Sequence, residues 1–143
     1  MPEICNVLDD GQVIDVFLAL ARPSPLDSVI IAGDESIELY LSLRRRGFAR
    51  VATPATCRIP KRRHVIGLVT GQDPVAALDH ASPFLTVNSA IAVLIESQEG
   101  DSSMTIRHKL QQMGFRIEAG VRCRQGFVLF ACRRGCSQME QAA

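Results

Sequence analysis

The 143-residue sequence contains no tryptophan, and its aromatic share is only 5%. Lysine is scarce as well, because arginine supplies 14 of the 16 basic residues. No apolar run approaches the ~20 residues that a membrane-spanning helix needs. The start, Met1-Pro2-Glu3, lacks the basic and then apolar pattern of a secretion signal. These absences predict a cytoplasmic protein without membrane contact.

Cysteine occurs in an odd number, five, and histidine only three times. An odd count without a secretion signal favours reduced thiols over a disulfide framework. Only Cys132 and Cys136 are closely spaced, and the histidines are scattered without the spacing of metal ligands. The sequence therefore predicts buried or terminal thiols and no metal site.

Apolar residues make up 47% of the chain and charged residues 22%, as in an ordinary globular domain. Helical and extended patterns alternate along it. Helices are expected at 11–21, 35–46, 102–113 and from residue 73 to a stop at Pro83, and strands at 28–32, 50–53, 65–69, 90–95, 115–123 and 127–131. This order predicts an α/β fold, a three-layer αβα sandwich with a mostly parallel sheet that ends in an antiparallel hairpin.

The hydrophobic pattern also assigns faces to the predicted elements. In the strand at 115–123 apolar and polar residues alternate, as on an outer strand, whereas 127–131 is apolar throughout and predicts an interior strand. The turn between them falls near Gln125-Gly126. The helix residues expected to face the sheet are Ile37, Tyr40, Leu41 and Leu43 in one helix, and Met104, Leu110 and Met113 in another.

Three stretches carry a resemblance to a known family. The run from Val29 to Gly33 resembles a first strand with its glycine turn, and Leu43 to Val51 resembles a helix end that leads into a second strand. The last fifty residues give a buried strand, a helix, an outer strand and an interior strand. Together they resemble S-adenosylmethionine-dependent methyltransferases over roughly residues 28–133. The resemblance implies a shortened Rossmann-like fold, because the chain between residues 54 and 64 is too short for a strand-and-helix unit.

The sequence departs from this family where the family binds its cofactor. The family's first loop reads acid-x-Gly-x-Gly-x-Gly, and here Gly33 fits the first glycine while Glu35 and Ile37 occupy the next two positions. After the second strand the family carries an acid that accepts the ribose hydroxyls, whereas this chain has Thr53. The resemblance thus implies a degenerate motif, and we expect no bound cofactor, with S-adenosylmethionine as the alternative.

Two further motifs have competing interpretations. Gly71-Gln72-Asp73-Pro74 partly matches the Asp/Asn-Pro-Pro-aromatic motif of family members that act on amino groups, but Asp73 as a helix cap before Pro74 explains the pair without chemistry. Asp34 and Glu35 would repel the pyrophosphate of a nicotinamide cofactor, and they suit the positive end of a helix instead.

The charges are segregated along the chain. Residues 1–38 hold eight acids and one base, and residues 39–64 hold eight bases and no acid. The basic segment, which we define as residues 44–63, is either a phosphate-binding surface or a set of charges paired with the acidic N-terminal residues of the same or a neighbouring chain. Its candidate anion contacts are Arg44, Arg45, Arg46, Lys61, Arg62 and Arg63.

Three functional hypotheses follow from the sequence. The first is a methyltransferase-like domain, residues 28–135, that serves as a non-catalytic binding or regulatory module, preceded by a helix and linker at 1–27 and followed by a flexible tail at 136–143. The second is an active methyltransferase, and the third is a nucleic-acid-binding protein that uses the basic segment. A homodimer and an acidic partner are both compatible with these hypotheses. The residues expected to line a cofactor pocket are Gly33, Asp34, Glu35, Thr53, Gly71 and Asp73.

Overall fold

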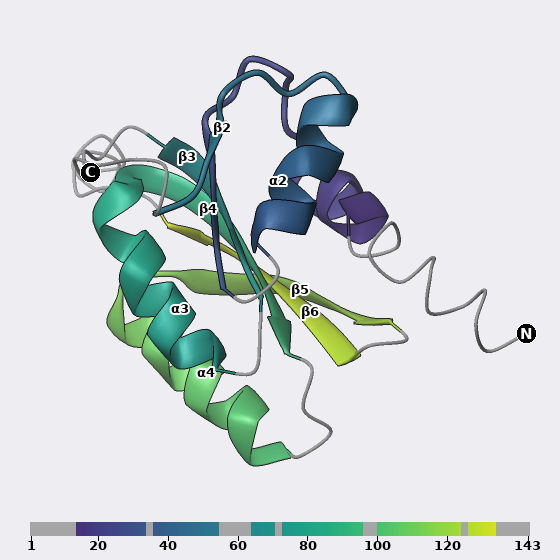
Figure 1. Ribbon diagram of the computed structural model, residues 1–143. Helices are drawn as coiled ribbons and strands as arrows, with labels where there is room; N and C mark the ends of the chain where they lie inside the picture. Colours follow the sequence, from purple (N-terminus) through teal and green to yellow (C-terminus); the bar gives the residue numbers. More distant parts are fainter. Residues whose placement is uncertain are drawn as a thin grey trace, which may run out of the picture.

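The computed structural model describes residues 14–33, 36–54, 64–70, 73–95, 100–123 and 126–133. Six strands form one sheet in the order β2-β1-β3-β4-β6-β5 (Figure 1). The strands are β1 (Val29–Ala32), β2 (Val51–Ala52), β3 (His64–Val69), β4 (Leu85–Ile95), β5 (Arg116–Cys123) and β6 (Gly126–Arg133). The helices are α2 (Ser36–Arg45), α3 (Pro74–Ala81), the 3₁₀ turn η1 (Ser82–Phe84), α4 (Gly100–Gln112) and a helical segment at 14–21.

The sheet is parallel over four strands and antiparallel at one end. β1 pairs in parallel with β2 and β3, and β3 pairs in parallel with β4. β6 then pairs antiparallel with both β4 and β5. The predicted α/β fold, with a mostly parallel sheet and a terminal hairpin, is therefore confirmed.

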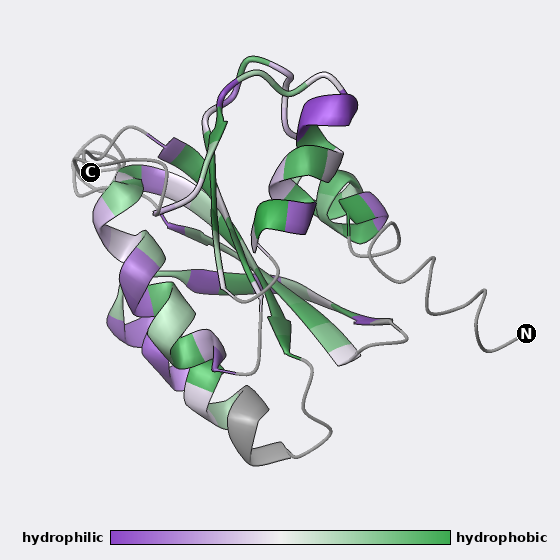
Figure 2. Ribbon diagram, in the orientation of Figure 1, coloured by the Kyte–Doolittle hydropathy of each residue, from purple (hydrophilic) through white to green (hydrophobic). Residues whose placement is uncertain are grey.

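Helices cover both faces of the sheet, as the apolar strands require (Figure 1). α3 and α4 lie on one face, and α2 with the segment 14–21 lies on the other. Coloured by hydropathy, the strands are largely hydrophobic and the helices carry hydrophilic residues among hydrophobic ones (Figure 2). The molecule thus has the three layers that the sequence predicts.

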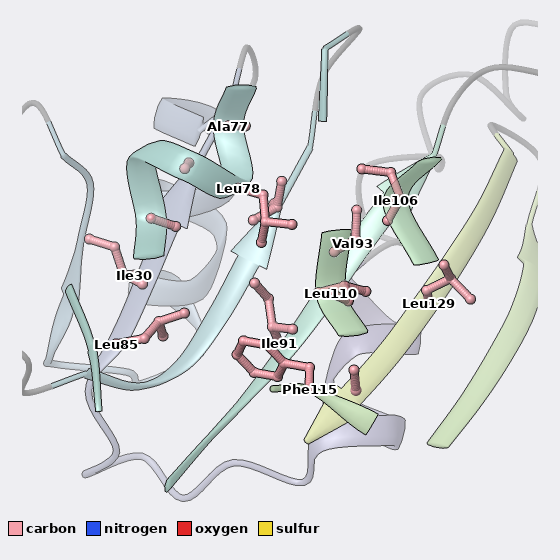
Figure 3. Packing of buried hydrophobic residues seen from close by; sticks show 14 of the residues in the cluster. Ile30, Ala77, Leu78, Leu85, Ile91, Val93, Ile106, Leu110, Phe115 and Leu129 are labelled. Atoms are coloured by element: carbon pink, nitrogen blue, oxygen red, sulfur yellow. The ribbon is translucent and has the colours of Figure 1, made fainter. Parts of the chain in front are cut away.

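Each face has its own hydrophobic core. On the face of α3 and α4, Leu78, Ile106 and Leu110 pack against the sheet residues Ile91 and Leu129 (Figure 3). On the other face, Ile14 and Phe17 are fully buried in the cluster that contains Leu39 and Leu43. The N-terminal helix therefore belongs to the same folded unit as the sheet.

Two helices are rotated relative to the sequence prediction. In α2 the buried residues are Leu39 and Leu43, whereas Ile37 is 53% exposed and Leu41 is 46% exposed. The assignment of Ile37 and Leu41 to the inner face was wrong, because apolar residues occur nearly all round this helix and its periodicity does not fix one face. In α4, Leu110 is buried as expected, but Met104 is 67% exposed and Ile106 is buried in its place.

The hairpin of β5 and β6 matches its prediction. β6 lies between β4 and β5 and is buried over residues 128–131, whereas residues 116–122 of β5 alternate between half-buried and exposed. The Phe127 ring lies over Gly120 of β5. A Cβ at position 120 would be 2.5 Å from the Phe127 Cζ atom, so the ring occupies the space of a side chain there. The aromatic ring of β6 thereby covers a strand position that has no side chain.

At the other end, β2 is the edge of the sheet formed by the described residues. The described part of the chain returns from β2 across β1 to β3, so the direction of the strand order reverses between β1 and β3. Among the described residues, no helix is long and apolar enough to cross a membrane. The reversal matters for function, because ligands of open α/β sheets bind at the carboxyl ends of the strands that flank such a point.

Candidate functional site

The candidate site lies at the carboxyl ends of β1, β2 and β3. Because these strands are parallel, their ends meet at one edge of the sheet. Gly33 follows β1, Thr53 follows β2 and Thr70 follows β3, while Asp73 precedes α3. Three of the six predicted pocket residues therefore lie near this edge: Gly33, Thr53 and Asp73. The other three, Asp34, Glu35 and Gly71, lie outside the described residues.

Gly33 is held against the end of β3. Its φ is +121°, and a Cβ at this position would be 1.8 Å from the Thr70 carbonyl oxygen. The Thr70 amide donates to the Ala32 carbonyl at 3.0 Å, which fixes the two strand ends side by side. Glycine is therefore required here by the close approach of two backbones, whatever the site binds.

Thr70 supplies an unsatisfied polar group at this edge. Its side chain is fully buried, and its Oγ1 atom has no hydrogen-bond partner among the residues that the structure describes. A buried hydroxyl without a partner costs about 1–3 kcal/mol relative to one that is hydrogen-bonded. Thr70 is not among the pocket residues predicted from the sequence: its place after the apolar run of β3 is visible there, but its missing hydrogen bond is not.

Thr53 occupies the position after β2 where the resemblance places an acid. It is 1% exposed and carries a hydroxyl in place of a carboxylate. A neutral, buried side chain cannot provide two charged acceptor oxygens for a ribose diol. The described residues of this edge therefore do not fit the family's way of holding the nucleoside of S-adenosylmethionine.

Asp73 caps α3. Its Oδ1 accepts a hydrogen bond from the Ala76 amide at 3.2 Å, and Pro74 stands at the start of the helix. The capping interpretation of Asp73-Pro74 is therefore confirmed, since this arrangement satisfies one of the free amides of the first turn. A surface groove of about 380 Å³ begins near this end of α3 at Val75 and continues along Met104 and His108 of α4.

Two arginines of the basic segment, Arg44 and Arg46, make contacts within the chain. Arg46 forms an ion pair with Asp15 at 2.7 Å, and Arg44 donates to the Ala49 carbonyl at 2.8 Å. Arg44 also lies over the Tyr40 ring, with its Cζ 5.9 Å from the ring centre, and Arg45 is exposed. Asp15 supplies the intramolecular acid that one of the two interpretations requires. Lys61, Arg62 and Arg63 lie outside the described residues.

No cluster of metal-ligating side chains occurs among the residues that the structure describes. Cys132 on β6 carries a half-buried thiol. His64 is buried at the start of β3, with its Nδ1 3.3 Å from the Phe84 carbonyl oxygen and its ring edge-on to Phe84. Its position at the amino end of β3 separates it from the candidate site.

Comparisons with known proteins agree with this architecture. No protein-family model matches the sequence, and no curated protein matches it either. Solved structures do resemble it. A methyltransferase from Aquifex aeolicus that depends on S-adenosylmethionine (SAM) is 12% identical, with a TM-score of 0.53, over 93% of this chain and 98% of that one.

Two further structures give similar values. A SAM-dependent O-methyltransferase from Thermotoga maritima is 14% identical with a TM-score of 0.58, over 87% of this chain and 65% of that one. A ribosomal protein L11 methylase from Lactobacillus delbrueckii subsp. bulgaricus is 12% identical with a TM-score of 0.55, over 88% and 79% of the two chains. In each case the likeness lies in the fold, since so little of the sequence is shared. The chain has a shortened version of the Rossmann-like fold of SAM-dependent methyltransferases.

Proposed function

We propose that this protein is a methyltransferase-like domain that acts as a non-catalytic binding or regulatory module. The observation that carries the proposal is the buried Thr53 at the end of β2, 1% exposed and without a carboxylate. Ribose hydroxyls are bound strongly by a charged acceptor, because charge-assisted hydrogen bonds are about twice as strong as neutral ones. Loss of that acceptor removes the main polar contact to the nucleoside.

The retained glycine does not weigh against the proposal. Gly33 is needed for the contact with the Thr70 carbonyl, where an added Cβ would overlap the oxygen at 1.8 Å. A domain that no longer binds a cofactor would still need glycine to bring β1 and β3 together. Gly33 is therefore consistent with a purely architectural role.

Isothermal titration calorimetry tests the proposal. S-adenosylmethionine and S-adenosylhomocysteine are each titrated into the full chain. The expected result is no saturable heat at ligand concentrations up to about 1 mM. A dissociation constant of about 1 mM would correspond to only ~4 kcal/mol of binding free energy. Saturable binding of either compound in the micromolar range would overturn it.

Thr70 favours the alternative, an active methyltransferase with a variant cofactor loop. Its Oγ1 is buried without a partner next to Gly33, and a polar ligand atom at this edge would satisfy it. An unsatisfied buried group in a native protein calls for an explanation, such as stored strain, a catalytic role, or a bound water or ion. Gly33, Thr53 and Thr70 would line the cofactor pocket in this case, with Asp73 nearby.

The variant Thr70→Val separates the two candidates. It keeps the shape of the side chain and removes only the hydroxyl. An active enzyme that uses this hydroxyl would lose about tenfold in affinity for S-adenosylmethionine, the equivalent of one hydrogen bond of ~1.4 kcal/mol. If wild type and variant both show no binding, the non-catalytic module stands.

A further inference from the structure

The outward surface of α2 carries two exposed apolar side chains. Ile37 is 53% exposed and Leu41 is 46% exposed. They lie one turn apart on the same side of the helix, opposite the buried residues Leu39 and Leu43. Isolated exposed apolar residues need no explanation, but these two form a stripe along a helix that is already anchored by its other side.

Charges of opposite sign stand at the two ends of this stripe. Glu38 is exposed in the first turn of α2, and Arg44 and Arg45 are exposed in its last turn. The surface therefore runs from negative through apolar to positive along the helix. A helix with this pattern is complementary to a copy of itself that runs in the opposite direction.

The architecture leaves this surface open. Consecutive right-handed crossovers that step outward along a sheet place their helices on the same face. Within the described part of the chain the sheet stops at β2, so α2 is the outermost helix on its face. Its helical neighbour there is the segment 14–21, joined to it by the Asp15–Arg46 ion pair.

We propose that α2 is a homodimer interface, in which its outward surface packs against the same surface of a second copy in an antiparallel helix pair centred on Leu41. About a twofold axis at Leu41, the two Leu41 side chains meet each other. Glu38 then faces the partner's Arg45, and Ile37 lies against the aliphatic stem of the partner's Arg44. Arg44 donates from Nη1 to the Ala49 carbonyl within its own chain, and its aliphatic stem remains available to the partner's Ile37.

The interface is small, and this sets its expected strength. Two half-exposed apolar side chains and one pair of charges per copy bury less than the roughly 1,200 Å² of a stable complex. We expect a reversible dimer with a dissociation constant of about 10–100 µM. The inference goes beyond the proposed function and does not depend on whether any cofactor binds.

Analytical ultracentrifugation of the full chain, from about 5 µM to about 500 µM, tests the proposal around the expected dissociation constant. Leu41→Glu places two like charges at the twofold axis and should weaken the dimer at least ~10-fold. Met104→Glu, at a residue of α4 that is 67% exposed, is the matched control and should leave the dimer unchanged.

Charge reversal tests the register. Glu38→Arg and Arg45→Glu should each weaken association, and the double variant should restore it, since the charge pair is then present with its signs exchanged. A wild-type chain that remains monomeric at the highest concentration would overturn the proposal. So would a Leu41→Glu variant that dimerises as wild type does, or a double variant that associates no better than the single ones.

Discussion

The guanidinium carbon of Arg133 lies 4.6 Å above the centre of the Phe115 ring. From this position Nη2 of Arg133 donates to the Thr86 carbonyl at 2.8 Å and Nη1 donates to the Met113 carbonyl at 3.2 Å. One side chain at the end of β6 thus joins the start of β4 to the end of α4. The contact lies at the edge of the sheet opposite the candidate functional site.

Removal of this contact should lower stability. We expect Arg133→Ala to reduce the free energy of unfolding by about 2–4 kcal/mol. The variant loses two hydrogen bonds donated by the charged guanidinium and one stacking contact in a partly buried site. Arg133→Lys should recover less than half of the loss, because an ammonium cannot reach both carbonyls in the same geometry. Urea unfolding measures all three proteins. The exposed Arg122 of β5 provides the control, since Arg122→Ala should stay within ~0.5 kcal/mol of wild type.

Gly33 should tolerate no side chain. Gly33→Ala drives a Cβ into the Thr70 carbonyl oxygen at 1.8 Å, and we expect a loss of more than ~4 kcal/mol or failure to fold. Gly47 has a similar backbone angle, φ +99°, but no atom within 4 Å of an added Cβ. Gly47→Ala should therefore cost only the ~1 kcal/mol of backbone strain. If thermal unfolding gives equal losses for the two variants, the contact with Thr70 is not the reason for glycine at position 33.

The unpartnered hydroxyl of Thr70 should be dispensable for stability. Thr70→Val removes a buried group that has no hydrogen-bond partner, so we expect a gain of up to ~1 kcal/mol in the absence of ligand. The same substitution at Thr86, whose Oγ1 donates to the Asn88 carbonyl at 2.8 Å, should cost about 1 kcal/mol. Chemical denaturation of both variants gives the comparison. A clear loss of stability in Thr70→Val would mean that the hydroxyl has a partner in solution.

The sequence predicted the order and type of the elements because each buried strand is a continuous apolar run. The short apolar run from Ala90 to Ile95 is typical of a buried strand, and the alternation along β5 is typical of a strand with one covered face. The buried face of a helix was harder to predict. α2 has the apolar residues Ile37 and Leu41 on one side and Leu39 and Leu43 on the other, and only packing against the sheet determines which side is buried. β4 begins at Leu85, five residues before its apolar core, and there Leu85 pairs with His64 of β3, a contact that the sequence does not reveal.

The candidate site was predicted only in part. Gly33 and Thr53 were recognised from their places after two strands, and those places are visible in the sequence. The role of Gly33 was not visible in the sequence, because this role depends on the Thr70 carbonyl. Thr70 is 37 residues away in the sequence and is brought close only by the pairing of β1 with β3. Thr70 was missed for the same reason, since the absence of a hydrogen-bond partner is a property of the packed structure.

Asp73 should contribute to stability through the cap of α3. We expect Asp73→Ala to lower the free energy of unfolding by about 1 kcal/mol, because the Ala76 amide loses its acceptor, and Asp73→Asn to remain within a few tenths of a kcal/mol of wild type. Asparagine keeps the capping oxygen and removes the charge, so the pair of variants separates capping from any role that needs a carboxylate. Urea denaturation monitored by circular dichroism measures both variants. If Asp73→Asn destabilised the chain as much as Asp73→Ala, the negative charge rather than the hydrogen bond to Ala76 would hold the start of α3.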